Sequence, residues 1–127
     1  MLVGDSAGAG SIAMHLIANN GKPTELFAGA FGVSPFFPTQ MRVSELEWQF
    51  DLYASRAGCN GTDDPLACLR GKDTNVLQIA NAAMAFPGRT TPAVFPFSPA
   101  IDQDLIADFP YTMIQQGRFV KVPVVFG

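Results

Sequence analysis

The pentapeptide Gly4-Asp5-Ser6-Ala7-Gly8 holds a serine between two glycines in the pattern GxSxG. Where a strand turns sharply into a helix, such a serine lies at the apex with a strained backbone, and its hydroxyl is free to attack a carbonyl carbon. The following backbone N–H, that of Ala7, then points at the developing oxyanion beside the positive end of the helix. We expect both glycines to be required sterically, because a side chain at either position would collide with the neighbouring strand or helix. The pattern indicates acyl transfer through Ser6.

The same stretch can also be divided as a dinucleotide-binding fingerprint, with Gly8, Gly10 and Ala13 in the pattern GxGxxA. In that motif the strand runs directly into the first glycine, and an acidic residue follows about 20 residues later to bind the ribose. Here three residues intervene after the strand, and Glu25 comes too early and in a turn. A further alternative is that Ser6 is only a structural serine in a glycine-rich turn, because five residues alone are not specific.

The elements that must position Ser6 follow from the hydrophobic pattern. We expect a strand at 1–3, a helix over 7–20 ended by Asn20-Gly21, and a buried strand at 26–33. Three further helices are expected from the capping box Ser44-Glu45-Leu46-Glu47 to Gly58, from the cap Asp64 to Gly71, and from Asp73 to Phe86. Prolines after Pro87 predict irregular structure until a last buried strand at 122–127.

This order of strand, helix, strand, helices and strand predicts an α/β fold with a mostly parallel sheet and flanking helices. Two whole strands and part of a third make a poor sheet on their own, so we expect the sequence to be incomplete. The 127 residues are 48% hydrophobic and 15% charged, which suits one modest globular core.

Charge and hydropathy exclude several classes of partner. The net charge of −3 and the scattered basic residues argue against nucleic acid and anionic membrane surfaces. No apolar run approaches the roughly 20 residues of a membrane span. The first residues of the sequence do not have the basic and then apolar pattern of a secretory leader.

Cys59 and Cys68 lie close together, and the sequon Asn60-Gly61-Thr62 directly follows the first. A disulfide across so short a loop would contribute roughly 2.5–3 kcal/mol. A glycan on Asn60 would need the same secretory compartment, so the pair predicts an extracellular protein. The alternative is two buried thiols and an unused sequon.

Five blocks of the sequence together resemble the type-B carboxylesterase family, which includes cholinesterases and secreted fungal lipases. They are GDSAGAGSIAMHL, LFAGAFGVSPFFPTQ, the segment from Cys59 to Ala67-Cys68-Leu69-Arg70, FSPAIDQDLIADFP and GRFVKVPVVFG. The resemblance runs essentially end to end, in the family's order, and is strongest to the fungal branch. It implies a carboxylic ester hydrolase with an α/β-hydrolase fold of roughly four times this length. Residues 1–127 are then an internal fragment of one such domain.

The resemblance assigns roles to individual residues. Ser6 matches the nucleophile and Ala7 the oxyanion-hole residue. Asp5 stands where many members have glutamate, and it is a structural flank of the motif rather than the triad acid. Phe95 and Phe97 fall where aromatic residues line the acyl pocket of cholinesterase-like members, with a plain core role as the equal alternative.

The resemblance also implies what the sequence lacks. Cys59 and Cys68 match a family disulfide, while the triad glutamate, the triad histidine and the glycine-rich oxyanion loop lie outside residues 1–127. His15, the only histidine, lies nine residues after Ser6 on the same expected helix, about 13 Å along its axis, and is interpreted as a packing residue.

We therefore expect a serine esterase that acts on a small-molecule or lipid ester, without metal or cofactor, and that is inactive as this fragment. The alternatives are a catalytically dead esterase-like binding domain and, third, a dinucleotide-binding fragment.

Overall fold

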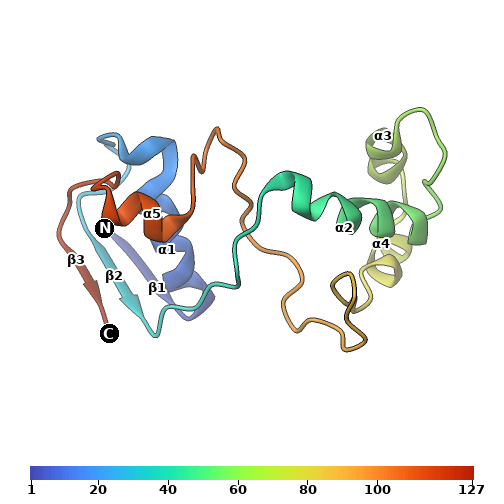
Figure 1. Cartoon of the computed structure of the whole chain (residues 1–127), viewed down its shortest axis with the longest axis horizontal. Helices are drawn as coiled ribbons and strands as arrows, with labels where there is room; N and C mark the ends of the chain where they lie inside the picture. The colour runs from blue at the N-terminus through green and yellow to red at the C-terminus, as the bar shows by residue number, and fades with distance from the viewer. The chain divides into compact units, whose positions relative to one another are not determined.

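The computed structural model describes residues 1–127, which form two compact units. Unit 1 joins Met1–Val43 to Ser98–Gly127, and unit 2 is Ser44–Phe97. The elements labelled in Figure 1 are β1 (Leu2–Asp5), α1 (Ala7–Ile17), a 3-10 turn η1 (Ala18–Gly21), β2 (Ala30–Val33), α2 (Val43–Arg56), α3 (Pro65–Arg70), α4 (Thr74–Ala80), α5 (Pro110–Gln115) and β3 (Val124–Phe126). That both units belong to a single domain of a longer protein stays a prediction.

The sheet of unit 1 has three parallel strands in the order β1-β2-β3 (Figure 1). Leu2 pairs with Ala30, and Ala30 pairs in turn with Val124. The predicted parallel sheet is confirmed. Because parallel strands end at a common edge, the carboxyl ends of β1, β2 and β3 bring Asp5, Val33 and Phe126 together there.

Helix α1 is buried on two sides, which fixes it in unit 1. One side packs against the sheet, where Ile12 and Leu16 join a cluster with Phe27, Ala30 and Val120. The other side contributes Met14 and Ile17 to a second cluster. That cluster also contains Ile101, Ile106 and, from α5, Met113. Apolar residues at three- and four-residue steps therefore cover both sides of the helix.

The second face of the sheet is uncovered in the described chain. Alternate residues of the strands point to it, and Val3, Phe31, Val33 and Val125 are all exposed. A parallel sheet is normally covered on both faces, which agrees with a partial α/β fold. No helix of the chain has both the length and the apolar character needed to cross a membrane.

Unit 2 consists of α2, α3 and α4, and its helix starts match the sequence signals. The Asp64 carboxylate accepts a hydrogen bond from the Ala67 N–H at 2.9 Å, and Pro65 takes the first helical position of α3. The Asp73 carboxylate accepts from the Asn75 N–H at 2.8 Å. These predicted caps are confirmed. Helix α2 begins at Val43, one residue before the expected cap at Ser44.

Several element predictions are wrong. The strand expected at 26–33 is only Ala30–Val33, and Leu26 is exposed. The buried strand expected at 122–127 is only Val124–Phe126, and Val125 is exposed. Helix α4 ends at Ala80 rather than near Phe86, and the carbonyl oxygens of Ala82 and Ala83 accept hydrogen bonds from the Arg56 guanidinium. Helix α5 was unexpected, since Pro110 begins this helix instead of breaking one. Helix α1 stops at Ile17, and Asn19 and Asn20 follow with left-handed φ values of 51° and 65°.

The segment after Ser98 contains a tight turn at residues 102–106. The Asp102 carboxylate accepts the backbone N–H of Ile106 at 2.8 Å and that of Asp104 at 3.0 Å. These hydrogen bonds lower the pKa of Asp102 below its ordinary value of 3.8, and the bond from Ile106 has the largest effect. Gln103 inside the turn has a φ of 63°, in the left-handed region that favours glycine.

Candidate active site

Ser6 lies between the last residue of β1 and the first residue of α1, and its backbone is strained. Its φ is 53° and its ψ −116°, a combination rare for a residue with a side chain. The predicted order of strand, strained serine and helix is confirmed. The Ser6 side chain is exposed and makes no capping hydrogen bond to α1.

Three backbone hydrogen bonds hold Ser6 in this conformation. Its N–H donates to the Val33 carbonyl at 2.9 Å, which ties it to the end of β2. Its own carbonyl accepts from the N–H of Gly10 at 3.0 Å and from the N–H of Phe36 at 3.1 Å. Because these partners come from β2, from α1 and from the loop after β2, the surrounding structure determines the strained geometry several times over.

The two glycines of the pentapeptide are not equivalent. A Cβ atom on Gly4 would lie 2.5 Å from the Gly8 carbonyl carbon and 2.8 Å from the Ala9 nitrogen, both backbone atoms. A Cβ atom on Gly8 would have no such neighbour within 4 Å, so the expectation that Gly8 is required sterically is wrong. Within α1 the crowded glycine is instead Gly10, whose Cβ would overlap the Phe36 carbonyl.

The backbone N–H of Ala7 is available to a ligand. Ala7 is the first residue of α1, and the first N–H groups of a helix have no acceptor within the helix. Both Ser6 and Ala7 are exposed residues, and they lie at the positive end of the helix. This arrangement can place a nucleophile and an oxyanion donor side by side.

A second strained residue lies at the same edge of the sheet. Ser34 follows β2 with a φ of 48°, and its N–H donates to the Gly127 carbonyl at 2.5 Å. Sequence reasoning placed residue 34 in a loop and missed this conformation, as it missed the contact of Gly10 with Phe36. The available signal was the glycine spacing in α1, which marks a helix that approaches another backbone closely.

The side chains flanking Ser6 do not complete a catalytic set. His15 is exposed rather than packed, so that interpretation is wrong. Its Nδ1 lies 2.8 Å from the Ser11 carbonyl oxygen, one turn back on α1, and therefore donates the hydrogen there. Asp5 ends β1 and is exposed. Within residues 1–127 no cluster of His, Cys, Asp and Glu could hold a metal ion.

The dinucleotide alternative is contradicted by the position of its glycines. Gly8 and Gly10 both lie inside α1, after the strained Ser6, and not in a turn between strand and helix. The fingerprint requires its first glycines in the turn before the helix, where the backbone approaches the pyrophosphate, and Gly8 and Gly10 do not lie there.

Phe95 and Phe97 belong to unit 2, with 57% and 49% of their surfaces exposed. Both side chains are thus about half exposed within residues 1–127, and the core role and the acyl-pocket role both stay predictions. Phe97 lines a surface pocket of about 440 Å³ in unit 2 together with Phe50 and Tyr53. A second pocket of about 360 Å³, in unit 1, is lined by polar residues that include His15 and Lys22 and by apolar residues, and Ser6 lines neither pocket.

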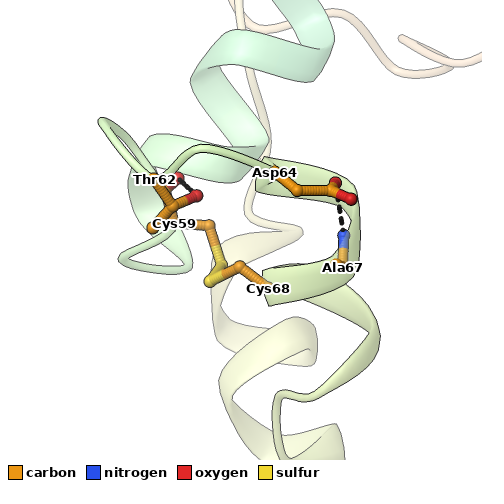
Figure 2. The surroundings of a disulfide bond; sticks show 5 residues. All are labelled: Cys59, Thr62, Asp64, Ala67 and Cys68. Carbon is orange, nitrogen blue, oxygen red and sulfur yellow. Dashed lines mark hydrogen bonds between the residues drawn. A yellow bond between two sulfur atoms is a disulfide. The ribbon is translucent and has the colours of Figure 1, made fainter.

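Cys59 and Cys68 form a disulfide, with their Cα atoms 5.7 Å apart (Figure 2). Cys59 is fully buried, in a cluster with Ala54, Leu69 and Ala80. The prediction of a disulfide is confirmed, and the alternative of two free thiols is wrong.

The parallel sheet, the helix that follows β1 and the strained serine at the carboxyl edge define a partial α/β-hydrolase fold. The sequence model of the carboxylesterase family matches residues 1–127. The chain therefore belongs to the carboxylesterase family.

Individual relatives agree with this family. Lipase 1 of Geotrichum candidum is 33% identical over 140 aligned residues, which cover 100% of this chain and 24% of the relative. A protein named secreted lipase from Arthroderma benhamiae is 43% identical over 91 residues, 70% of this chain and 17% of the relative. The crystal structure of Aspergillus niger EstA superposes with a TM-score of 0.90 at 43% identity, over 96% of this chain and 24% of that one. The chain thus spans about a quarter of the length of Lipase 1 and of EstA.

Proposed function

We propose that the chain is the nucleophile-bearing part of a serine carboxylic ester hydrolase of the carboxylesterase or lipase type. The observation that supports this most directly is the backbone of Ser6, with φ 53° and ψ −116° between β1 and α1. Residues in such conformations persist only where surrounding contacts maintain them, and they cluster at active sites. The names of the relatives, which are lipases, favour an ester of a small molecule or a lipid as substrate.

In the proposed reaction the Ser6 Oγ attacks the ester carbonyl carbon, and the carbonyl oxygen becomes an oxyanion. The N–H of Ala7 donates to that oxygen while the alcohol departs and an acyl group remains on Ser6. Water then releases the acid. A base must remove the serine proton, and the only histidine of the chain donates to the Ser11 carbonyl instead. We therefore infer that the 127-residue chain alone does not hydrolyse esters.

A fluorophosphonate that labels activated serines tests both parts of this proposal. In the longer protein that contains this chain, we expect rapid stoichiometric labelling at Ser6 and loss of ester hydrolysis in the Ser6→Ala variant. The matched control is Ser11→Ala, which removes an exposed serine of α1 outside the motif. The isolated chain should label no faster than its Ser6→Ala variant. Full hydrolysis by Ser6→Ala would refute the nucleophile, and rapid labelling of the isolated chain would refute its inactivity.

We also propose that the longer protein is secreted. The disulfide Cys59–Cys68 supports this, because such bonds persist in oxidising compartments, and one relative is named a secreted lipase. The natural protein should appear in the culture medium with both thiols blocked to alkylation. Retention inside the cell with alkylatable thiols would contradict the proposal.

A further inference from the structure

The sequon Asn60-Gly61-Thr62 lies inside the short loop that the disulfide closes, directly after Cys59. Asn60 is exposed, as an N-glycan acceptor must be. The third sequon position accepts only serine or threonine, so the hydroxyl of Thr62 is the group that a glycosyl transferase must recognise. The state of this hydroxyl therefore decides whether Asn60 can be modified.

In the closed loop the Thr62 hydroxyl is already engaged. Its Oγ1 donates to the Cys59 carbonyl at 2.9 Å, across the sequon itself (Figure 2). The acceptor is fixed, because Cys59 is fully buried and its N–H donates to the Ala54 carbonyl at 2.8 Å. Gly61 between them has a φ of 75°, so the sequon is bent into a turn.

The Thr62–Cys59 hydrogen bond and the bend at Gly61 both depend on the position of Cys59. The disulfide anchors Cys59 to Cys68 on α3, and Asp64 caps that helix within the same loop (Figure 2). A single hydrogen bond of ordinary strength lowers the population of the free hydroxyl by about fivefold. An open loop lacks the disulfide anchor and keeps only the hydrogen bond from the Cys59 N–H to Ala54, so the sequon extends more readily and its hydroxyl is more often free.

We infer that Asn60 is an N-glycosylation site that is modified more readily before than after closure of the Cys59–Cys68 disulfide. In the transfer step, Nδ2 of Asn60 bonds to the anomeric carbon of an oligosaccharide held on a polyprenyl diphosphate. The bond from that carbon to the diphosphate oxygen breaks, the diphosphate leaves with the electron pair, and the amide loses one proton to a base of the transferase. In the closing step the two thiols lose two electrons and two protons to the disulfide of an oxidoreductase, which becomes a dithiol.

Cell-free translation into microsomes tests this order on nascent chains, so the outcome does not depend on whether a variant folds. The 127-residue chain is translated behind an added leader, with and without dithiothreitol. The key variant is Cys68→Ser, which prevents closure and leaves Cys59 and the sequon unchanged. Asn60→Gln is the control without an acceptor. Glycosidase-sensitive mobility gives the occupancy, and enzymatic release in ¹⁸O water followed by mass spectrometry locates it at Asn60 and separates it from deamidation.

We expect partial occupancy of the natural sequence under oxidising conditions, and a rise of up to about fivefold with dithiothreitol. Cys68→Ser should show the high occupancy under both conditions, and Asn60→Gln should show none. Absence of a glycan on Asn60 under every condition would overturn the site. Equal occupancy of the natural sequence and Cys68→Ser under oxidising conditions would overturn the order.

Discussion

The strained turn at Ser6 depends on one glycine of the pentapeptide and not on the other, and a pair of alanine substitutions separates them. In Gly4→Ala the new Cβ would lie 2.5 Å from the Gly8 carbonyl carbon, 2.6 Å from its oxygen and 2.8 Å from the Ala9 nitrogen. These are backbone atoms of α1, which cannot rotate away. Overpacking typically costs 1–3 kcal/mol, and we expect about 3 kcal/mol here because β1 and α1 must separate.

Gly8→Ala adds the same methyl group at the last position of the motif, where no neighbour lies within 4 Å. Gly8 lies in the first turn of α1, and alanine is the better helix former, so we expect a gain of about 0.5–1 kcal/mol. The two variants should therefore differ by about 4 kcal/mol although their compositions are identical.

Hydrogen exchange of peptides from β1 and α1, read by mass spectrometry, measures this difference within unit 1. Protection in Gly4→Ala should fall by roughly two powers of ten, and protection in Gly8→Ala should be unchanged or higher. Gly10→Ala, whose Cβ would overlap the Phe36 carbonyl, should resemble Gly4→Ala. Equal protection in Gly4→Ala and the natural sequence would refute the steric argument. So would an equal loss in Gly8→Ala.

Three further predictions concern stability. Replacing Cys59 and Cys68 together by serine opens a loop of sequence separation 9, and unit 2 should lose about 2.7 kcal/mol in urea unfolding followed by the sole tryptophan. A midpoint unchanged by the replacement would contradict this. Hydrogen bonds, led by the one from the Ile106 N–H, lower the pKa of Asp102 in the folded chain. The stability that the ionised Asp102 contributes is therefore present above its unfolded pKa and is lost as the pH falls through the lower folded pKa. Asp102→Asn should flatten the acid limb of a stability profile, and an unaltered limb would count against the role. Gln103→Gly should stabilise unit 1 by about 1 kcal/mol because it relieves a φ of 63°, and a lower melting temperature would contradict that expectation.

The sequence predicted those parts of the fold that short-range patterns determine. Asp64 and Asp73 are caps with local acceptor geometry, and both act as expected. The segment after α4 shows what such patterns miss, because Ala82 and Ala83 accept hydrogen bonds from Arg56, a residue more than twenty positions earlier. Pro110 shows a different limit, because a proline ends one helix and begins another with equal ease, and only packing decides which.

The candidate site divides in the same way. Its backbone was predictable, because GxSxG after an apolar strand describes a turn built from neighbouring residues. The crowding at Gly4 was predictable for the same reason, because its close neighbours are Gly8 and Ala9. The crowding at Gly10 was not, because it depends on how closely α1 approaches the loop at Phe36. His15 was misplaced for a related reason. Its neighbours Met14 and Leu16 are buried on opposite sides of α1, which leaves position 15 outside both clusters.

The strain at Ser6 and its reactivity are separate properties of this chain. The strain is maintained by Val33, Gly10 and Phe36, through backbone hydrogen bonds that need neither a base nor an acid. Reactivity requires a proton acceptor at the hydroxyl, and catalytic residues that act as a unit lose nearly all their effect when one is missing. A chain can therefore fold this turn correctly and still fail to react. Labelling at Ser6 that appears only in the longer protein, with equal exchange protection of α1 in both, would demonstrate that separation directly.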